Sequence, residues 1–423
     1  MTKAKVSTFK AFRSTNYTLY FIGRSISQFG TWMQRTAVVW VVYTLTHSAF
    51  MLGLTIFAEQ FPSFLLSAFG GVAADRYNRF KIINITQITS MIQAILLAVL
   101  VMTNHYVVWE ILTLSVLLGI INAYDIPARQ ALINEVVEDE SDLPSALSLS
   151  ASMASLTKIL GPALSGIILN EFGAGICFLI NAATFGGVML SIFFMKKPKA
   201  FIPKSKNKNV FKDLAAGFVY LRQQSSIGLV IVMLSVTGFL VLPYDTLMPV
   251  FAKLIFKGDA ATFGYINGFI GAGAVAGTLL LASLKKDAPM RRILVISTLI
   301  ISVGLICFSL TEHFYLAMFF AIIIGFGGVA QFTTCNIIVQ SESSPEMRGR
   351  AISILLTAIF GMLPLGSVVV GAVSQHIGAP KTIFIEGIIG IITAIVFARI
   401  LKKKKNASRQ LNMQAEEEML ETV

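Results

Sequence analysis

The sequence predicts an all-α membrane protein whose chain crosses the bilayer about twelve times. Two observations carry this prediction. Apolar segments of about 20 residues or more follow one another along the 423 residues, and each is long enough to span about 30 Å of hydrocarbon as a helix. The composition agrees, since 55% of the residues are hydrophobic and only 13% are charged.

The twelve transmembrane helices are expected in order along the chain. Their ranges are 17–45, 50–74, 82–102, 106–133, 146–170, 173–195, 227–253, 262–284, 291–311, 314–340, 349–375 and 380–401. Several connections are so short that the helices on either side must form antiparallel hairpins. The first span carries two arginines and is longer than the apolar region of a cleavable signal, so we expect it to be retained.

Basic residues mark one side of the membrane. Of the 34 Lys and Arg residues, 27 lie near the two termini and in alternate connections, whereas Lys253, Lys257 and Lys381 lie on the opposite side. Positive charge collects on the cytoplasmic side of membrane proteins. We therefore expect a multi-pass protein of the cell (inner or plasma) membrane with both termini in the cytoplasm. The net charge of +12 then reflects contacts with the lipid bilayer rather than with nucleic acid.

The chain divides into two halves at a lysine-rich stretch. We predict an N-terminal six-helix bundle at 1–195, a basic cytoplasmic linker at 196–226, a C-terminal six-helix bundle at 227–401 and a cytoplasmic tail at 402–423. Two parallel repeats of this kind are typical of secondary transporters, which bind substrate between the bundles near the midplane. We expect a monomer.

Recurring glycines support this duplication. Gly119 and Gly325 occupy like positions in spans four and ten, 206 residues apart. A seven-residue spacing separates two glycines at the end of span five, and it recurs at the end of span eleven. The residues of these two pairs are Gly166 with Gly173 and Gly371 with Gly378.

Residues 71–81, GVAADRYNRFK, lie between spans two and three on the predicted cytoplasmic side. This segment resembles the G-x-x-x-D-R-x-x-R-x-K signature of the major facilitator superfamily. The resemblance implies the major facilitator fold, in which two six-helix bundles alternate between open states. It also implies conformational gating by Gly71, Asp75, Arg76 and Arg79, with the aspartate meeting a helix N-terminus of the other half, where an anion is favoured.

Three further segments narrow the resemblance. They are GRSISQFGTW at 23–32, DIPARQ at 125–130 and LPYDTLMPVFA at 242–252. Together they resemble the secretion-effector branch of the superfamily, which includes enterobactin exporters and macrolide-efflux-like proteins. This resemblance implies a proton-driven exporter, an antiporter of a small organic molecule such as a siderophore or drug. The proton gradient would be its energy source, with no cofactor.

Span five contains GPALSG at 161–166, which is similar to the G-P-x-x-G-G core of the superfamily's antiporter motif. A physical interpretation stands beside the resemblance. Pro162 leaves a carbonyl one turn earlier unpaired and bends the helix, while Gly161 and Gly166 allow a neighbouring helix to approach closely. We expect a gating role for all three.

Charged side chains inside hydrocarbon cost several kcal/mol unless they are paired or face water. In span one Arg24, Gln28 and Arg35 share one helix face. We expect this face to line a cavity and to contact substrate. The alternative is that the arginines form structural pairs.

Matching depths along the helices predict two ion pairs, Arg24 with Asp125 and Arg35 with Glu59. Asp125 and Glu59 are the proton-coupling candidates, because a buried carboxylate binds a proton more readily once its arginine partner moves away. Asp125 also lies four residues before Arg129, so a local pair is the alternative.

Other polar residues complete the predicted site. Asn122 shares a face with Asp125 and Arg129, which favours cavity lining or gating. Asp245 follows a proline where span seven is expected to break, so it either gates the outer side or caps the broken helix. Lys158 is expected to contact an anionic substrate. The remaining cavity candidates are Tyr244, Gln331 and Asn336, whereas Glu386 is expected to be peripheral.

The residue types argue against other classes of membrane protein, namely enzymes and nucleotide-driven pumps. The three cysteines and four histidines lack the spacing of a disulfide framework, a metal site or a catalytic centre. The chain also has no G-x-x-x-x-G-K-[ST] nucleotide-binding loop. We therefore expect neither an enzyme nor a nucleotide-driven pump. An importer or a lipid flippase of the same fold remains the alternative, and a passive channel fits a duplicated bundle poorly.

Overall fold

The computed structural model describes residues 9–104, 106–196, 219–222, 224–285, 288–345 and 347–421. Most of the predicted linker 196–226 lies outside the described residues, as do the first eight residues and the last two of the predicted tail. The described chain is helical throughout its regular elements and contains no strand.

The first half of the chain forms six membrane-spanning segments. Its helices are α1 (Thr15–Thr46), α2 (Ala49–Arg76), α3 (Arg79–Met102), α4 (Val108–Val136) and α5 (Leu143–Phe194), with short 3-10 turns at Lys10–Arg13 and Glu140–Asp142. The 52 residues of α5 hold predicted spans five and six, which part at Gly173. Gly173 has φ 79°, a left-handed conformation that glycine adopts without steric cost.

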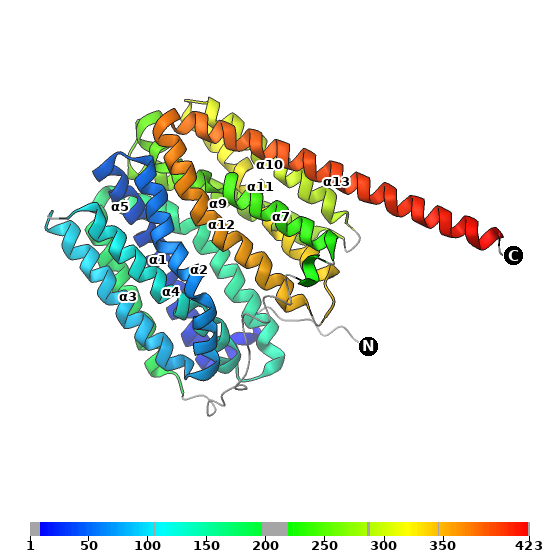
Figure 1. The fold of residues 1–423 in the computed structure, drawn as a ribbon. Helices are drawn as coiled ribbons and strands as arrows, with labels where there is room; N and C mark the ends of the chain where they lie inside the picture. Colours follow the sequence, from blue (N-terminus) through cyan, green and yellow to red (C-terminus); the bar gives the residue numbers. More distant parts are fainter. Residues whose placement is uncertain are drawn as a thin grey trace.

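The second half begins with a broken span. Predicted span seven consists of α7 (Ser225–Leu240), the 3-10 helix η3 (Leu242–Leu247), α8 (Met248–Val250) and the π-helix η4 (Phe251–Ile255). The break predicted around Pro243 is therefore confirmed, because proline has no N–H to continue the helical ladder. The later helices are α9 (Ala260–Ser283), α10 (Met290–Leu310), α11 (Phe314–Glu342), α12 (Arg348–Ile377) and α13 (Ala379–Glu421). In Figure 1, α13 continues past the predicted span 380–401 and projects away from the other helices.

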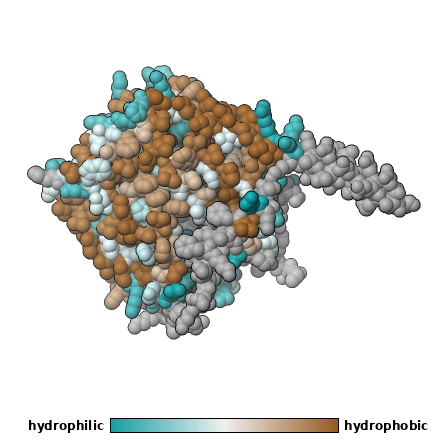
Figure 2. All heavy atoms as spheres, in the orientation of Figure 1, coloured by the Kyte–Doolittle hydropathy of each residue, from teal (hydrophilic) through white to brown (hydrophobic). Residues whose placement is uncertain are grey.

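Within the described residues, ten helices are long and apolar enough to cross a membrane. One of these holds two spans, since it contains the bend at Gly173. Polar side chains lower the hydropathy of α1, but its 32 residues are long enough to cross, which completes the twelve predicted crossings. Figure 2 shows hydrophobic side chains over most of the visible body, with hydrophilic ones toward its margins. The protein is thus an all-α, multi-pass membrane protein.

Equivalent glycines make equivalent contacts in the two halves. A Cβ atom at Gly119 of α4 would collide with the Glu59 carbonyl oxygen of α2, and one at Gly325 of α11 would collide with the Ile270 carbonyl oxygen of α9. Gly378, between α12 and α13, repeats the positive φ of Gly173, at 88°. The glycine repeat seen in the sequence therefore corresponds to a repeat in helix packing.

The two bundles touch along two helix pairs, α5 with α9 and α2 with α12. A Cβ atom at Gly166 would lie 2.6 Å from the Cα atom of Gly264, and one at Gly371 would lie 2.5 Å from the Ala49 carbonyl oxygen. These close approaches occur in the parts of the helices away from the α2–α3 connection. They seal one end of the molecule, and the α2–α3 connection lies at the other.

The glycines of α9 serve helix packing. Gly264 and Gly268 face α5, whereas Gly273 and Gly277 face the backbone of α11. Small residues at these spacings allow helices in a membrane to approach closely.

Candidate functional site

A cavity of about 2060 Å³ lies between α1, α2 and α4 of the first half and α12 of the second. Its lining reaches Asp75 and Arg76 at the end of α2 and Gly349 and Arg350 at the start of α12. The cavity is therefore open at the end that carries the α2–α3 connection, the end predicted to be cytoplasmic. The contacts between α5 and α9 and between α2 and α12 close the opposite end.

Most residues predicted for the site lie on the wall of this cavity. Of the predicted substrate and proton residues, the lining contains Arg24, Gln28, Arg35, Glu59, Asn122 and Asp125; of the predicted gating residues it contains Gly71, Asp75, Arg76 and Arg129. The shared face of span one is thus a cavity face.

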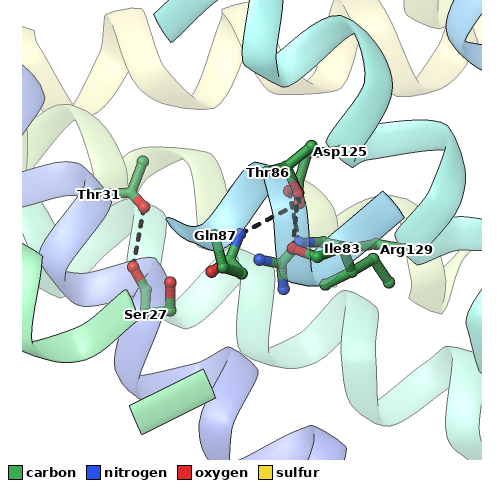
Figure 3. A network of polar contacts seen from close by, with 7 residues as sticks. All are labelled: Ser27, Thr31, Ile83, Thr86, Gln87, Asp125 and Arg129. Carbon is green, nitrogen blue, oxygen red and sulfur yellow. Dashed lines mark hydrogen bonds and ion pairs between the residues drawn. The ribbon is translucent and has the colours of Figure 1, made fainter. Parts of the chain in front are cut away.

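Asp125 is the centre of a buried polar cluster that joins α3 to α4 (Figure 3). Its Oδ1 accepts hydrogen bonds from Thr86 Oγ1 at 2.7 Å and from Gln87 Nε2 at 3.2 Å. Its Oδ2 accepts a hydrogen bond from Arg129 Nε at 2.5 Å. The side chains of Asp125 and Arg129 are almost wholly buried at the cavity wall.

The predicted Arg24–Asp125 ion pair is wrong, and the local Asp125–Arg129 pair is present instead. Residues four apart are neighbours on one face of a helix, so α4 brings these two groups together by itself, whereas the Arg24–Asp125 pair needs two helices to meet. Thr86 and Gln87 were missed by sequence reasoning. The sequence could have identified them as two adjacent polar residues in the mostly apolar span three, since a charged group in a membrane needs hydrogen-bonding neighbours.

Arg24 lies on the wall of the same cavity, and also borders a smaller cavity of about 250 Å³ beside α5. The charges of Arg129 and Asp125 both act on it. Within the described ranges, no carboxylate lies within ion-pair distance of its guanidinium. Among the described residues, Arg24 is therefore a cation on the cavity wall without an ion-pair partner.

The predicted Arg35–Glu59 pair is confirmed. Arg35 Nε lies 3.9 Å from Glu59 Oε2, an ion-pair distance that exceeds a hydrogen bond. The Arg35 guanidinium also lies 5.6 Å from the centre of the Trp32 ring, a cation–π distance. The pair spans α1 and α2 inside the cavity.

Lys158 of α5 and Asp245 of η3 lie within electrostatic range of Arg35, although no ion pair joins the three among the described residues. The side chains of Lys158 and Asp245 are exposed although both residues lie within membrane-spanning segments. Charged groups at such depth face water rather than lipid. They thus extend the polar surface from α1 to the broken span seven, outside the residues that line the large cavity.

Three further residues predicted for the cavity lie elsewhere. Gln331 is fully buried and donates a hydrogen bond from Nε2 to Thr237 Oγ1 of α7 at 3.2 Å. Tyr244 is buried in a hydrophobic core to which both halves contribute, since Val39 and Leu52 belong to it as well. Neither Gln331 nor Tyr244 lines the large cavity as predicted, because neighbouring helices cover both side chains. Asn336 is half-buried, accepts a hydrogen bond from Gln340 of the same helix and does not line the large cavity.

The expectation that Glu386 is peripheral is also wrong, because its side chain is 2% exposed. A nearly uniform apolar span gave no sign of the direction in which this residue points. The side chain lies inside the second bundle.

A buried amide network was missed entirely. Asn181 Nδ2 donates to Gln34 Oε1 at 2.7 Å, and Gln34 Nε2 donates to Gln93 Oε1 at 2.9 Å. The three residues link α5, α1 and α3 beside Arg35. Single amide residues in otherwise apolar spans were the available signal, since each must find a partner inside the bundle.

The gating residues of the α2–α3 connection behave differently from one another. Arg79 forms an ion pair with Glu135 at the end of α4 and donates to the Ala74 carbonyl at 3.0 Å. Asp75 faces the cavity, and in the part of the chain that the structure describes its side chain has no ion pair or hydrogen bond. The contact with a helix of the other half that the resemblance implies is thus not formed while this end is open.

The gating residues of α5 lie against its neighbours. A Cβ atom at Gly161 would lie 2.8 Å from Trp32 of α1, and Gly166 meets α9 of the other bundle. The carbonyl oxygen of Pro162 lies 2.9 Å from the Cβ position of Gly264. This segment is therefore part of the sealed end.

Comparison with known proteins gives consistent results. The model of the transmembrane secretion effector family matches residues 6–423. The chain is 27% identical to the staphyloferrin A transporter of Staphylococcus aureus, over 92% of this chain and 97% of the relative. It is 22% identical to macrolide efflux protein A of Streptococcus pyogenes, over 92% of this chain and 96% of the relative.

Among solved structures, the fold resembles that of a bacterial homologue of the human lysosomal transporter Spinster, in an inward-facing and unoccupied conformation. The TM-score is 0.72 at 14% identity, covering 92% of this chain and 96% of that chain. This likeness concerns the fold, two six-helix bundles of the major facilitator type.

Proposed function

The chain belongs to the transmembrane secretion effector family, and from this premise we propose that it exports an anionic small organic molecule in exchange for protons. The proposed cargo is a siderophore, whose anionic oxygens chelate iron. The family and the relatives are transporters rather than enzymes.

The observation that carries the proposed substrate class is the unneutralised Arg24. Five arginines and three carboxylates line the large cavity, so its wall has an excess of two positive charges. Arg129 and Arg35 are already paired with carboxylates, whereas Arg24 is not. A desolvated arginine favours a carboxylate or catecholate oxygen and disfavours a lipophilic cation.

Alternating access supplies the transport cycle. With the predicted topology, the cavity faces the cytoplasm, so cargo enters from the cell interior. Export then requires the α5–α9 and α2–α12 contacts to separate while the end near Asp75 closes. Asp75, unpartnered among the described residues of the open state, is free to meet the other bundle in the closed one.

Proton exchange is assigned to the buried carboxylates of the first bundle. Asp125 accepts hydrogen bonds from Arg129 and from two neutral donors, and in the proposed cycle it takes up a proton when Arg129 turns toward bound cargo. Glu59, with its long contact to Arg35, is the second candidate. Cargo binding and proton binding would then compete for the same arginines.

The test is proton flux in proteoliposomes that contain the purified protein under an imposed pH gradient. The compounds added are staphyloferrin A, a macrolide, a lipophilic cation and a lysophospholipid. Proton flux that depends on the siderophore supports the proposal, and flux with the lipophilic cation alone would contradict the anionic class. Absence of flux with every compound, while labelled lysophospholipid equilibrates between leaflets, would favour a flippase.

A further inference from the structure

Glu386 is a buried acid that the proposed cycle does not use. It lies in the second turn of α13, and its side chain is 2% exposed. Neither carboxyl oxygen has a hydrogen-bond partner among the described residues. In the same region, Gly387 lies so close to α10 that a Cβ atom would come within 2.8 Å of the Ser302 carbonyl oxygen. The helices leave little room for water here.

A carboxylate in this position would be strongly unfavourable. An ionised group without hydrogen bonds or a counter-ion costs many kcal/mol in an apolar interior, so such groups become neutral instead. The neutral acid has a much smaller cost. The structure therefore requires that Glu386 carry a proton in the present conformation.

Among the described residues, no cation forms an ion pair with Glu386. The elements packed against α13 are α7, α10, α12 and η3. Among the described side chains, the titratable groups that these elements and α13 itself carry are Tyr244, Asp245, Arg291, Arg292, Cys307, Arg348, Arg350, His376, Lys381, Arg399, Lys402 and Lys403. None forms an ion pair with Glu386 in the described part of the chain.

We propose that Glu386 is a proton-binding site of the second bundle, protonated while the large cavity is open and deprotonated when η3 moves. The step is the loss of a proton from the Glu386 carboxyl group to water. The role of Glu386 in transport rests on the proposed proton coupling, whereas its protonation does not.

The segment η3 connects this acid to the charged group that faces water. The segment packs against α13, and its Tyr244 is buried in the core, whereas the next residue, Asp245, is exposed. Because η3 is a 3-10 break followed by a π-helix, it is the part of span seven best able to change conformation. A shift of η3 driven by cargo near Asp245 would also uncover Glu386.

Infrared spectroscopy tests the protonation without any cargo. The full-length protein in lipid nanodiscs at neutral pH should show a protonated-carboxyl C=O band that is lost in Glu386→Gln. The matched control is Glu312→Gln, an exposed carboxylate in the same half, which should keep the band. A band unchanged in Glu386→Gln would overturn the proposal.

The conformational role is tested by distances between spin labels across the open end. Labels at Tyr77→Cys and Ser353→Cys, in a cysteine-free background, report whether the cavity is open. In the wild type the open population should fall as pH rises, because only a conformation that admits water accommodates the ionised acid. Glu386→Gln mimics the protonated acid and should stay open at high pH.

The two possible failures are distinguishable. Equal pH dependence in the wild type and Glu386→Gln would reject the conformational role of Glu386, whatever the cargo. Absence of proton flux in proteoliposomes with every compound tested would reject the proposed export instead. The infrared band and the label distances would still show whether Glu386 binds a proton.

Discussion

Gln375 at the end of α12 holds the first turn of α2, because its Oε1 accepts a hydrogen bond from the backbone N–H of Ala49 at 3.1 Å. The same oxygen accepts a hydrogen bond from Ser48 Oγ at 3.0 Å. The first N–H groups of a helix have no partner within the helix. Here a side chain of the other bundle supplies one, so the bond exists only while this end is sealed.

Gln375→Ala should therefore shift the population toward conformations in which the sealed end is open. The lost bond is worth about 0.5–1.5 kcal/mol, which corresponds to a shift of up to about tenfold. Label accessibility at the sealed end measures the change. Gln340→Ala, which removes an amide bonded within α11, is the control and should leave accessibility unaltered.

Asp125→Asn should abolish proton-coupled export while the protein still accumulates in the membrane. Asn keeps the size of the side chain and can accept hydrogen bonds from Thr86 and Gln87, but it cannot carry the proton. Proton flux in proteoliposomes measures coupling. Asp259→Asn is the matched control, since Asn also caps the N-terminus of α9. Full coupling in Asp125→Asn would remove Asp125 from the mechanism.

Arg24→Gln should weaken the binding of anionic cargo by about tenfold to a hundredfold, since a hydrogen bond to a charged group contributes about 1.5–3 kcal/mol. Binding of a siderophore to the purified protein, followed by calorimetry, measures this loss. Arg24→Lys keeps the charge and should retain part of the affinity. Equal affinity in all three proteins would contradict the anion-binding role.

Gly166→Leu should prevent the α5–α9 contact, because even a Cβ atom would lie 2.6 Å from the backbone of α9. The expected result is a protein that cannot seal this end and therefore transports poorly, measured as cargo flux and as accessibility of α9. Gly186→Ala is the control, since a Cβ atom at that position meets nothing within 4 Å. Wild-type flux in Gly166→Leu would show that the contact is not required.

Asn181→Ala should lower the free energy of unfolding by about 1–3 kcal/mol, because it leaves Gln34 Oε1 buried without its donor. The melting temperature in detergent reports the change. Asn170→Ala alters an exposed amide of the same helix and should have little effect. An unchanged melting temperature in Asn181→Ala would indicate that water replaces the lost bond.

The sequence by itself determined the features that depend only on position along the chain. The twelve spans follow from the length of apolar segments, because the hydrocarbon must be crossed by helices that satisfy their own backbone. The repeat of Gly119 and Gly325 and the break at Pro243 are likewise local signals. Arg35 and Glu59 were matched by depth on adjacent helices, and the matched depth was sufficient.

The tertiary structure decided the choices that depend on how each helix is rotated and what lies beside it. Depth alone also predicted Arg24 with Asp125, but Asp125 turns toward Thr86, Gln87 and Arg129. Arg24 is then left without an ion-pair partner in the described part of the chain. In nearly uniform apolar spans no hydrophobic face sets the rotation, because lipid and a neighbouring helix are equally apolar. The packing of α13 on α10 therefore determined that Glu386 points into the bundle, where burial requires the acid to be neutral.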